Sequence, residues 1–327
     1  MRVLVTGASG FLGSHIAEQL ARDGHEVRTL VRHSSNRRFL AGFPHEEAVG
    51  DVSEPASLRP ALAGIDAVVH AAGLVKARSA AEFEAINAGG TANLLAAADE
   101  AAPGLHRFVF VSSLAAHGPS EDGRPRPADA PAHPLTAYGR SKLHGEELVR
   151  GWRGADRAVI IRPATVYGPR DPALLPFFKA VRWRIAPLLA GGRNRISIIY
   201  AVDAARAIAQ VVTAQKDISG KVYSLDDGNI YSWRDLLTAI EGAVGHRALR
   251  ISSPRWAFYA AAIASEGFGF LLRRPVMLTR EKVLEMSQPA WVCSHAALSE
   301  EIGWSPRVDI TEGAKLTAQW YREQRWL

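Results

Sequence analysis

Short apolar runs alternate along the chain with stretches in which apolar side chains recur every three or four positions. The runs have the length of buried strands, and the recurrent spacing is typical of amphipathic helices. Strands that alternate with helices pair in parallel and carry helices on both faces of the sheet. We therefore expect an α/β fold with a doubly wound parallel sheet. The strands are expected at residues 1–5, 26–31, 48–52, 65–70, 108–111, 158–161 and 221–225.

A glycine-rich turn joins the first strand to the first helix, which is expected at residues 14–23. Residues 6–13 read TGASGFLG. Gly7 permits a tight turn, Gly10 lets the backbone approach a pyrophosphate, and Gly13 lets the helix pack closely on the strand. The free N–H groups and the dipole of the helix N-terminus attract phosphates. The turn therefore predicts a dinucleotide site at the carboxyl ends of the strands, with a purely structural turn as the alternative.

A basic loop at residues 32–38 follows the second strand. An acidic residue here would accept a hydrogen bond from the 2′-hydroxyl of NAD, but the loop has Arg32 and no acid. A guanidinium suits the 2′-phosphate of NADP. We therefore expect NADP(H) as the preferred cofactor and NAD(H) as the second choice, and the alternative explanation is a solvated basic loop. Asp51, after the third strand, is placed to meet the adenine amino group.

Three side chains farther along form a pattern that carries chemistry. Tyr138 and Lys142 are four positions apart at the start of a helix, so they share one of its faces. Ser113 ends the fifth strand. A phenol has a pKa of about 10, and a nearby ammonium lowers it, so Tyr138 can exchange a proton with a substrate near neutral pH. Ser113 can donate a hydrogen bond to the substrate oxygen, although Ser112 competes for that role and an ordinary exposed helix face is the alternative.

These motifs and the stretch RPATVYGP at residues 162–169 resemble those of the extended short-chain dehydrogenases/reductases, the NAD-dependent epimerase/dehydratase superfamily. The resemblance covers essentially the whole chain. It implies a Rossmann fold, an NAD(P) cofactor, no metal, and catalysis by Ser113, Tyr138 and Lys142. The implied cofactor contacts are Gly7, Ser9, Gly10, Phe11, Leu12, Arg32, Asp51, Val52, Ala71, Ala72, Gly73, Asn87, Val111, Tyr138, Lys142, Pro163, Thr165 and Val166. The implied substrate contacts are Leu74, Leu114, Ala115, Thr165 and Tyr167.

Departures from the superfamily pattern narrow the branch. Residues 114–116 are Leu-Ala-Ala where sugar-nucleotide dehydratases carry an Asp-Glu pair that removes water. Thr165 stands where sugar-nucleotide epimerases often have a substrate-binding asparagine. Arg32 favours an exchangeable NADP over a tightly held NAD. The Arg162–Pro163 pair, residues 31–36 and the C-terminal segment are similar to those of 3β-hydroxysteroid dehydrogenase-like and dihydroflavonol reductase-like ketoreductases.

The resemblance to this branch implies NADPH-dependent reduction of an apolar, lipid- or steroid-like ketone, or oxidation of the corresponding alcohol. Two other functions stay open. A sugar-nucleotide epimerase with tightly bound NAD would retain its cofactor through purification. A non-catalytic relative that senses the dinucleotide would keep its biological effect after Tyr138→Phe.

The second half of the chain is expected to divide between two parts. Residues 1–165 and about 196–227 are assigned to the dinucleotide-binding domain, and residues 166–195 and 228–327 to a smaller α+β substrate lobe.

The most apolar stretch is 254–272, which is too short and too often interrupted to span a membrane. We interpret it as a buried lid helix. The alternative is a substrate-lining or membrane-surface helix, with Arg273 and Arg274 at the lipid headgroups and peripheral membrane contact through residues 254–274. Either arrangement gives the substrate pocket an apolar roof.

Composition adds few constraints. A net charge of +6 over 327 residues is modest, and we expect a small-molecule partner and no nucleic acid. Cys293 is the only cysteine, which excludes an internal disulfide or a zinc cluster and indicates a buried thiol. The first strand begins at Met1, so we expect no leader peptide and a cytoplasmic protein, membrane-associated if the second interpretation holds. The resemblance implies a homodimer formed by helices near 84–102 and 138–150.

Overall fold

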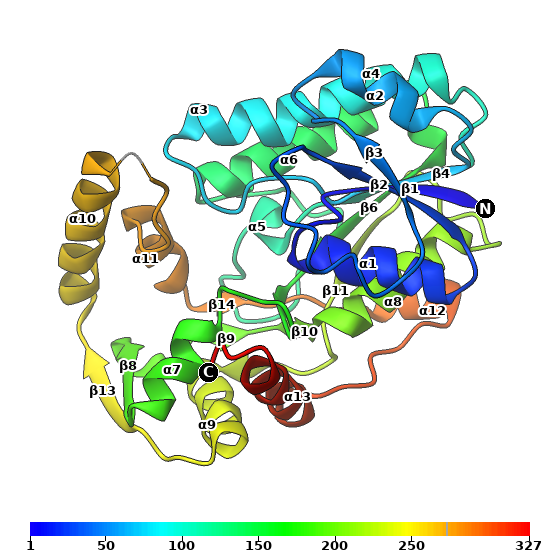
Figure 1. Ribbon diagram of the computed structural model, residues 1–327. Helices are drawn as coiled ribbons and strands as arrows, with labels where there is room; N and C mark the ends of the chain where they lie inside the picture. Colours follow the sequence, from blue (N-terminus) through cyan, green and yellow to red (C-terminus); the bar gives the residue numbers. More distant parts are fainter. Residues whose placement is uncertain (273) are drawn as a thin grey trace.

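A parallel seven-stranded sheet forms the centre of the computed structural model, which describes residues 1–272 and 274–327 (Figure 1). Its strands are β1 (Arg2–Thr6), β2 (Glu26–Val31), β3 (Glu46–Val49), β4 (Ala67–His70), β5 (Arg107–Val111), β6 (Ala158–Pro163) and β11 (Val222–Leu225). The spatial order is β11-β6-β5-β4-β1-β2-β3, and all neighbours are parallel. The order reverses between β1 and β4, which opens a crevice at the carboxyl ends of these strands. The expected doubly wound fold is confirmed.

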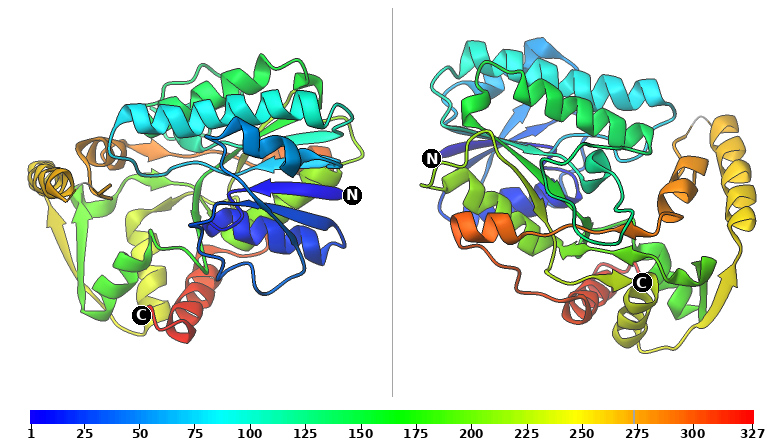
Figure 2. Two further views of the ribbon diagram at one scale, coloured as in Figure 1. Left: turned by 45° about the horizontal axis from the view of Figure 1, so that its top comes forward. Right: turned by 180° about the vertical axis from the view of Figure 1, so that it is seen from behind.

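Helices cover both faces of this sheet (Figures 1 and 2). One face carries α1 (Phe11–Arg22), α8 (Ala201–Thr213) and α12 (Ala296–Ile302), and the other carries α2 (Pro55–Leu62), α4 (Gly90–Ala101) and α6 (Ala137–Arg150). Most residues of the inner strands β1, β4, β5 and β6 are apolar and buried, as strands between two helix layers require, whereas the edge strand β3 is largely exposed. Leu298 and Trp304 pack into the first of these cores, so the segment around α12 contacts the large sheet.

Several element boundaries differ from the sequence expectation. The first helix begins at Phe11 rather than at residue 14, and β4 begins at Ala67 rather than at residue 65. β3 ends at Val49 rather than at Val52. The N–H of Gly50 still donates to the carbonyl of Val31, and the chain then turns into α2. The helix expected near 84–102 begins earlier, at α3 (Ala80–Phe83), where the Ser79 side chain accepts from the N–H of Glu82. It continues as a π-helical turn, Glu84–Gly89, and then as α4.

A second group of elements surrounds its own apolar core beyond the carboxyl ends of the sheet (Figure 2). Three helices and two small sheets build it, with Phe178, Tyr200 and Tyr321 among the buried residues. The helices are α7 (Leu175–Arg182), α9 (Trp233–Val244) and α13 (Ile310–Glu323). The strand pairs are β7 (Thr165–Tyr167) with β10 (Ile198–Tyr200), and β8 (Ile185–Leu189) with β13 (Leu249–Ser253). A third small sheet joins β9 (Arg195–Ile196) to β12 (Tyr231–Ser232) and β14 (Ala290–Trp291). Short helices lie at α5 (Leu114–His117), Ala155–Arg157 and Ala190–Gly192.

The apolar stretch 254–272 is not a buried lid, so that expectation is wrong. It forms α10 (Arg255–Leu271), which projects from the edge of the molecule (Figures 1 and 2). Within the helix only Ala262 and Gly269 are buried. Among the described residues its packed face rests mainly on α11 (Arg280–Met286), with Gly269 close to Val276. Among the described residues, no helix combines the length and apolarity that a membrane crossing demands. Cys293 is buried as expected, and burial raises the pKa of its thiol.

Candidate active site

The glycine turn has the geometry of a phosphate cradle. Gly7 has φ +71°, and a Cβ there would lie 2.7 Å from the backbone of Ala71 and Ala72 at the end of β4. A Cβ on Gly13 would overlap the carbonyl of Gly7. No described side chain caps the N-terminus of α1 after Gly10, so its first N–H groups stay available for an anion. These observations fit a bound dinucleotide pyrophosphate.

Arg32 and Asp51 lie together at the ends of β2 and β3. The Arg32 Nη1 and the Asp51 Oδ2 are 3.8 Å apart, and the Arg32 side chain stays 62% exposed. The N–H of Arg32 donates to Ser35 Oγ over 3.0 Å, which fixes the start of the basic loop. A long, exposed ion pair is weak, so the guanidinium is available to a ligand phosphate. Val52 is buried behind them and contacts Gly90 at the start of α4.

Ser113, Tyr138 and Lys142 are brought together at the carboxyl end of β5. Ser113 follows β5, and its Oγ accepts a hydrogen bond from the N–H of Ala115 over 3.1 Å. Tyr138 is the second residue of α6, whose N-terminus is capped by Thr136. A hydrogen bond with Ser113 lowers the pKa of Tyr138, but burial has the larger effect and leaves that pKa raised above 10.0.

Lys142 lies one helical turn from Tyr138, and its side chain is buried. The Nζ is 4.3 Å from the centre of the Phe110 ring. Burial lowers the pKa of Lys142 to about 8, although the nearby Glu146 carboxylate raises it. The ammonium therefore titrates close to the physiological range.

Asn87 joins this cluster from the π-helical turn Glu84–Gly89, a rare conformation that is frequent at functional sites. Its Oδ1 accepts from the N–H of Leu74 over 2.7 Å. Its Nδ2 donates to the Leu74 carbonyl (3.1 Å) and to Ser141 Oγ (2.9 Å). A Cβ on Gly73 would lie 3.0 Å from Asn87 Oδ1 and 4.0 Å from Lys142 Nζ. Gly73, Asn87 and Lys142 therefore form one wall of the crevice.

The other residues expected to contact the cofactor differ in how far their side chains are buried. Ser9, Phe11, Leu12, Ala71, Ala72 and Val166 are partly buried, Thr165 is exposed, and Val111 and Pro163 are buried at strand ends. Of the expected substrate contacts, Leu74 and Ala115 are partly buried and Leu114 is buried beside Ala164 and Cys293.

Tyr167 does not fit its expected role as a substrate contact. Its ring is buried in the second core, and its hydroxyl donates to the carbonyl of Asp309 over 3.1 Å. A tyrosine at the end of a strand suits packing in a core as well as contact with a substrate. The sequence pattern therefore could not distinguish these two roles for Tyr167.

The sequence pattern did not predict a buried ion pair beneath Lys142. Arg162 of β6 donates to both oxygens of Glu146 on α6, at 2.8 and 2.7 Å, and Ser112 donates to the same carboxylate at 2.6 Å. Glu146 follows Lys142 by four positions, and that helical spacing is the signal that could have found it.

A histidine network beside the glycine turn was also missed. His70 is fully buried at the end of β4, with its ring nitrogens 2.7 Å from Thr6 Oγ1 and 3.0 Å from Thr91 Oγ1. Thr6 Oγ1 in turn accepts from the N–H of Ala72 over 3.1 Å. Burial lowers the pKa of His70 to about 3, so the ring stays neutral and links β1, β4 and α4.

The roof over Tyr138 is α11 and carries carboxylates, which corrects the expectation of an apolar roof formed by residues 254–272. Glu281 Oε2 accepts from the N–H of Ala137 over 2.8 Å, and Glu281 Oε1 accepts from Arg140 over 3.1 Å. The Glu285 carboxylate raises the pKa of Tyr138 further. Nothing in the local sequence linked these residues to the catalytic helix.

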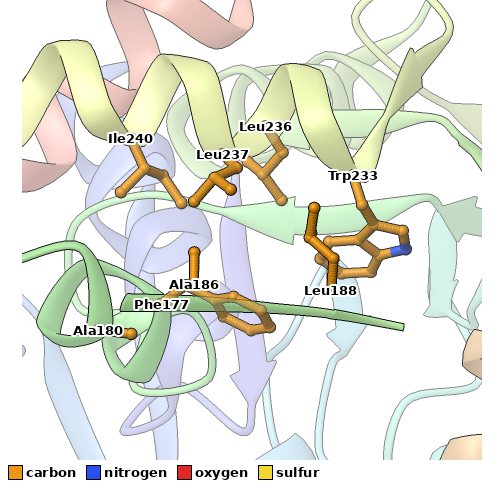
Figure 3. Close-up of a pocket in the computed structure, with 8 residues that line it drawn as sticks. All are labelled: Phe177, Ala180, Ala186, Leu188, Trp233, Leu236, Leu237 and Ile240. Carbon is orange, nitrogen blue, oxygen red and sulfur yellow. The ribbon is translucent and has the colours of Figure 1, made fainter. Parts of the chain in front are cut away.

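Two cavities in the described structure lie away from this cluster. One, of about 20 Å³, is an apolar gap between α7, β8 and α9, lined by side chains such as Phe177, Trp233 and Leu237 (Figure 3). A space of this size holds about one water molecule and no substrate. The other, of about 190 Å³, lies beside α1 and is lined by His15, Arg170 and other residues.

Comparison with known proteins gives consistent results. The model of the NAD dependent epimerase/dehydratase family matches residues 3–225. A ceramide reductase of Caulobacter vibrioides is 32% identical over 99% of this chain and 96% of its own length. A 4-hydroxy-2-methyl-3-oxo-4-farnesyl-3,4-dihydroquinoline-1-oxide ketoreductase of Stigmatella aurantiaca is 32% identical over 81% of this chain and 80% of its own. The NAD-bound structure of DesIV, a dTDP-glucose 4,6-dehydratase from Streptomyces venezuelae, is 26% identical with a TM-score of 0.79, covering 99% of this chain and 98% of its own.

Proposed function

The chain belongs to the NAD dependent epimerase/dehydratase family and is an NAD(P)-dependent oxidoreductase, and we propose that it reduces a ketone to a secondary alcohol with NADPH. The observation that carries this proposal is the convergence of Ser113, Tyr138 and Lys142 beside the glycine turn. When bound, a reduced nicotinamide supplies the hydride that the carbonyl carbon accepts.

The three side chains provide the remaining chemistry. The Ser113 Oγ accepts from Ala115. When a substrate binds, the O–H of Ser113 donates to the carbonyl oxygen instead of to Tyr138 and so fixes the position of that oxygen. Tyr138 donates its phenolic proton to the oxygen as negative charge develops there. Protonated Lys142, one helical turn from Tyr138, holds the nicotinamide ribose, with Asn87 beside it, and its positive charge favours the phenolate that remains after proton transfer.

NADP(H) is the proposed cofactor because Arg32 offers an exposed guanidinium at the end of β2. The preference for NADP over NAD rests on this side chain, since the loop at residues 32–38 has no carboxylate to accept from a ribose hydroxyl. Asp51, 3.8 Å away, is placed to accept from the adenine amino group.

The proposed substrate is an apolar ketone of the lipid or steroid class. Support comes from the relatives, whose names describe reduction of a ceramide and of a farnesylated dihydroquinoline oxide. Residues 114–116 also lack the carboxylates that the resemblance assigns to dehydratases.

A sugar-nucleotide epimerase with tightly bound NAD is the second candidate. Its support is the 26% identity to a dTDP-glucose 4,6-dehydratase, a sugar-nucleotide enzyme whose structure holds NAD. The two candidates differ in how they hold the cofactor. Denaturing the purified protein and identifying any released nucleotide separates them: stoichiometric NAD supports the epimerase, whereas empty protein that consumes added NADPH supports the reductase.

Tyr138→Phe tests the proposed chemistry. Removal of the proton donor is expected to lower kcat for NADPH-dependent ketone reduction by about 10² to 10⁴, with NADPH binding retained. Oxidation of NADPH is followed by absorbance with long-chain 3-keto, steroid-like and sugar substrates. Tyr223→Phe is the matched control, because its buried hydroxyl on β11 has no hydrogen-bond partner among the described residues. Undiminished turnover by Tyr138→Phe would contradict the assignment.

A further inference from the structure

The outer face of α10 is apolar and uncovered. Trp256, Ile263, Phe270 and Leu271 are 73, 57, 88 and 76% exposed. Their spacing places them on one side of the helix, and the described residues between them on that side, such as Ala260, carry no charge. Most apolar side chains of this size are buried in the protein, and a contiguous exposed group marks a surface that contacts another molecule.

The charges around this face are positive. Arg255 begins α10 and Arg274 follows it, and both are exposed. Arg255 donates to the carbonyl of Ser287, and among the described residues neither arginine pairs with a carboxylate. The one acid of α10, Glu266, accepts from the N–H and Nε of Arg280 at 2.8 and 2.7 Å, so it is directed at α11.

The apolar surface continues along the same edge of the molecule. β13 leads into α10, and the two lie along one edge in every view (Figures 1 and 2). Leu249 and Ile251 of β13 are exposed, as is Trp183 beside them. The N–H of Leu249 donates to the carbonyl of Arg184 over 2.8 Å, which holds the two segments together.

We propose that α10 and this adjoining edge dock the protein on the surface of an anionic phospholipid bilayer. Tryptophan, phenylalanine and leucine side chains enter the boundary between headgroups and acyl chains, while flanking arginines meet lipid phosphates. The helix lies on the membrane, since no described helix is able to cross it. A second copy of the chain is a poorer occupant, because a two-fold contact through this face would bring like-charged arginines together. The proposal is independent of the proposed function.

The docking face is one helix away from the catalytic cluster. Glu266 ties α10 to Arg280 of α11, and Glu281 of α11 accepts from the N–H of Ala137, next to Tyr138. A bilayer bound at α10 therefore lies beside the roof of the active site.

Vesicle co-sedimentation of the full chain tests the proposal. Vesicles of phosphatidylcholine with 30% phosphatidylglycerol are compared with pure phosphatidylcholine vesicles, in about 50 mM and 500 mM NaCl. We expect binding to the anionic vesicles at low salt, and a loss of at least about tenfold in affinity at high salt. The variant I263E/F270E is expected to lose at least about tenfold at low salt, because both carboxylates would enter the apolar boundary.

The variant A56E/Q210E is the control, since it changes the net charge equally at exposed positions of α2 and α8. Circular dichroism and thermal unfolding verify that both variants fold. Absence of vesicle binding at low salt, or equal binding by I263E/F270E and the wild type, overturns the proposal. It is also overturned if I263E/F270E converts a dimer to a monomer in gel filtration while the wild type ignores vesicles, because the face is then covered by a second copy.

Discussion

At the scale of single residues, the catalytic cluster keeps a lysine in an environment that disfavours its charge. Lys142 is buried against Phe110, and that burial, only partly offset by Glu146, lowers its pKa to about 8. Tyr138 is shifted the other way, since burial raises its pKa above 10.0. The two groups are thus both protonated near neutral pH, which is the state that ketone reduction needs.

The pH dependence of reduction follows from these two shifts. Burial raises the pKa of Tyr138 and lowers that of Lys142, so we assign the alkaline limb of kcat/KM to Lys142. We expect kcat/KM to be constant below its pKa and to fall as pH rises through about 8, the pKa of Lys142. Steady-state assays from pH 6 to 10 measure the profile.

Lys142→Arg is the comparison for this profile, because a guanidinium stays charged throughout the range. Its residual activity should show no fall near pH 8. A wild-type profile that is flat to pH 9.5 would show that the charge of Lys142 is not required.

At the scale of elements, one buried ion pair joins the catalytic helix to the sheet. Arg162 on β6 and Glu146 on α6 are both almost completely buried, with 2% and 0% of their side chains exposed. Replacing both partners of such a buried ion pair by apolar residues lowers the stability of a protein far less than replacing one of them, because a single replacement leaves a buried charge unpaired.

Glu146→Gln therefore should lower the free energy of unfolding by about 3–5 kcal/mol, because Arg162 is left buried without a counter-charge. Urea unfolding followed by circular dichroism measures the change. Glu26→Gln, which breaks the exposed pair of Glu26 with Arg2, should change it by less than about 0.5 kcal/mol. The double variant E146M/R162M should recover much of the loss, and a Glu146→Gln protein as stable as the wild type would refute the account.

The parts of the candidate site that lie close together in the sequence could be predicted, because local backbone geometry determines their relative positions. Gly7, Gly10 and Gly13 are within one turn, and Tyr138 and Lys142 share one helix, so local rules place them correctly. Contacts between distant segments were not predictable. Glu281 reaches the N–H of Ala137 across 144 positions, and no periodicity links the two.

The apolar helix at residues 255–271 shows a second limit. As the most apolar stretch of the chain it is interpreted from sequence as a buried lid, with a surface helix as the alternative, and the buried lid is wrong. Burial depends on what packs against the helix, and among the described residues α10 packs mainly on α11, with Gly269 close to Arg274 and Val276.

At the scale of the whole molecule, the cofactor should stabilise the fold, because only the native chain assembles Gly7, Arg32 and Ala72 into one crevice. NADPH at 100 times its Kd adds about 2.7 kcal/mol to the free energy of unfolding, and NADH at the same concentration should add less. Thermal unfolding with each nucleotide measures the difference.

Arg32→Asp should reverse this order of stabilisation, since a carboxylate repels a 2′-phosphate and accepts from a 2′-hydroxyl. Arg59→Asp on α2, where an exposed pair with Glu100 is lost, makes the same change of charge and should leave the order unchanged. Equal stabilisation by the two nucleotides in the wild type would remove the basis for an NADP preference.

The homodimer that the resemblance implies, formed by α4 and α6, stays a prediction.

The position of β11 at the edge of the sheet has a consequence for synthesis on the ribosome. β11 pairs with β6 through Val222 and Ile160, although β7, α7 and α8 lie between them in the chain. At about 5–20 residues per second, the outer edge of β6 waits roughly three to twelve seconds for its partner. During that interval the nascent chain exposes an unpaired apolar strand, the kind of edge that recruits other chains. We therefore expect slower translation between these two strands to increase aggregation of the nascent chain.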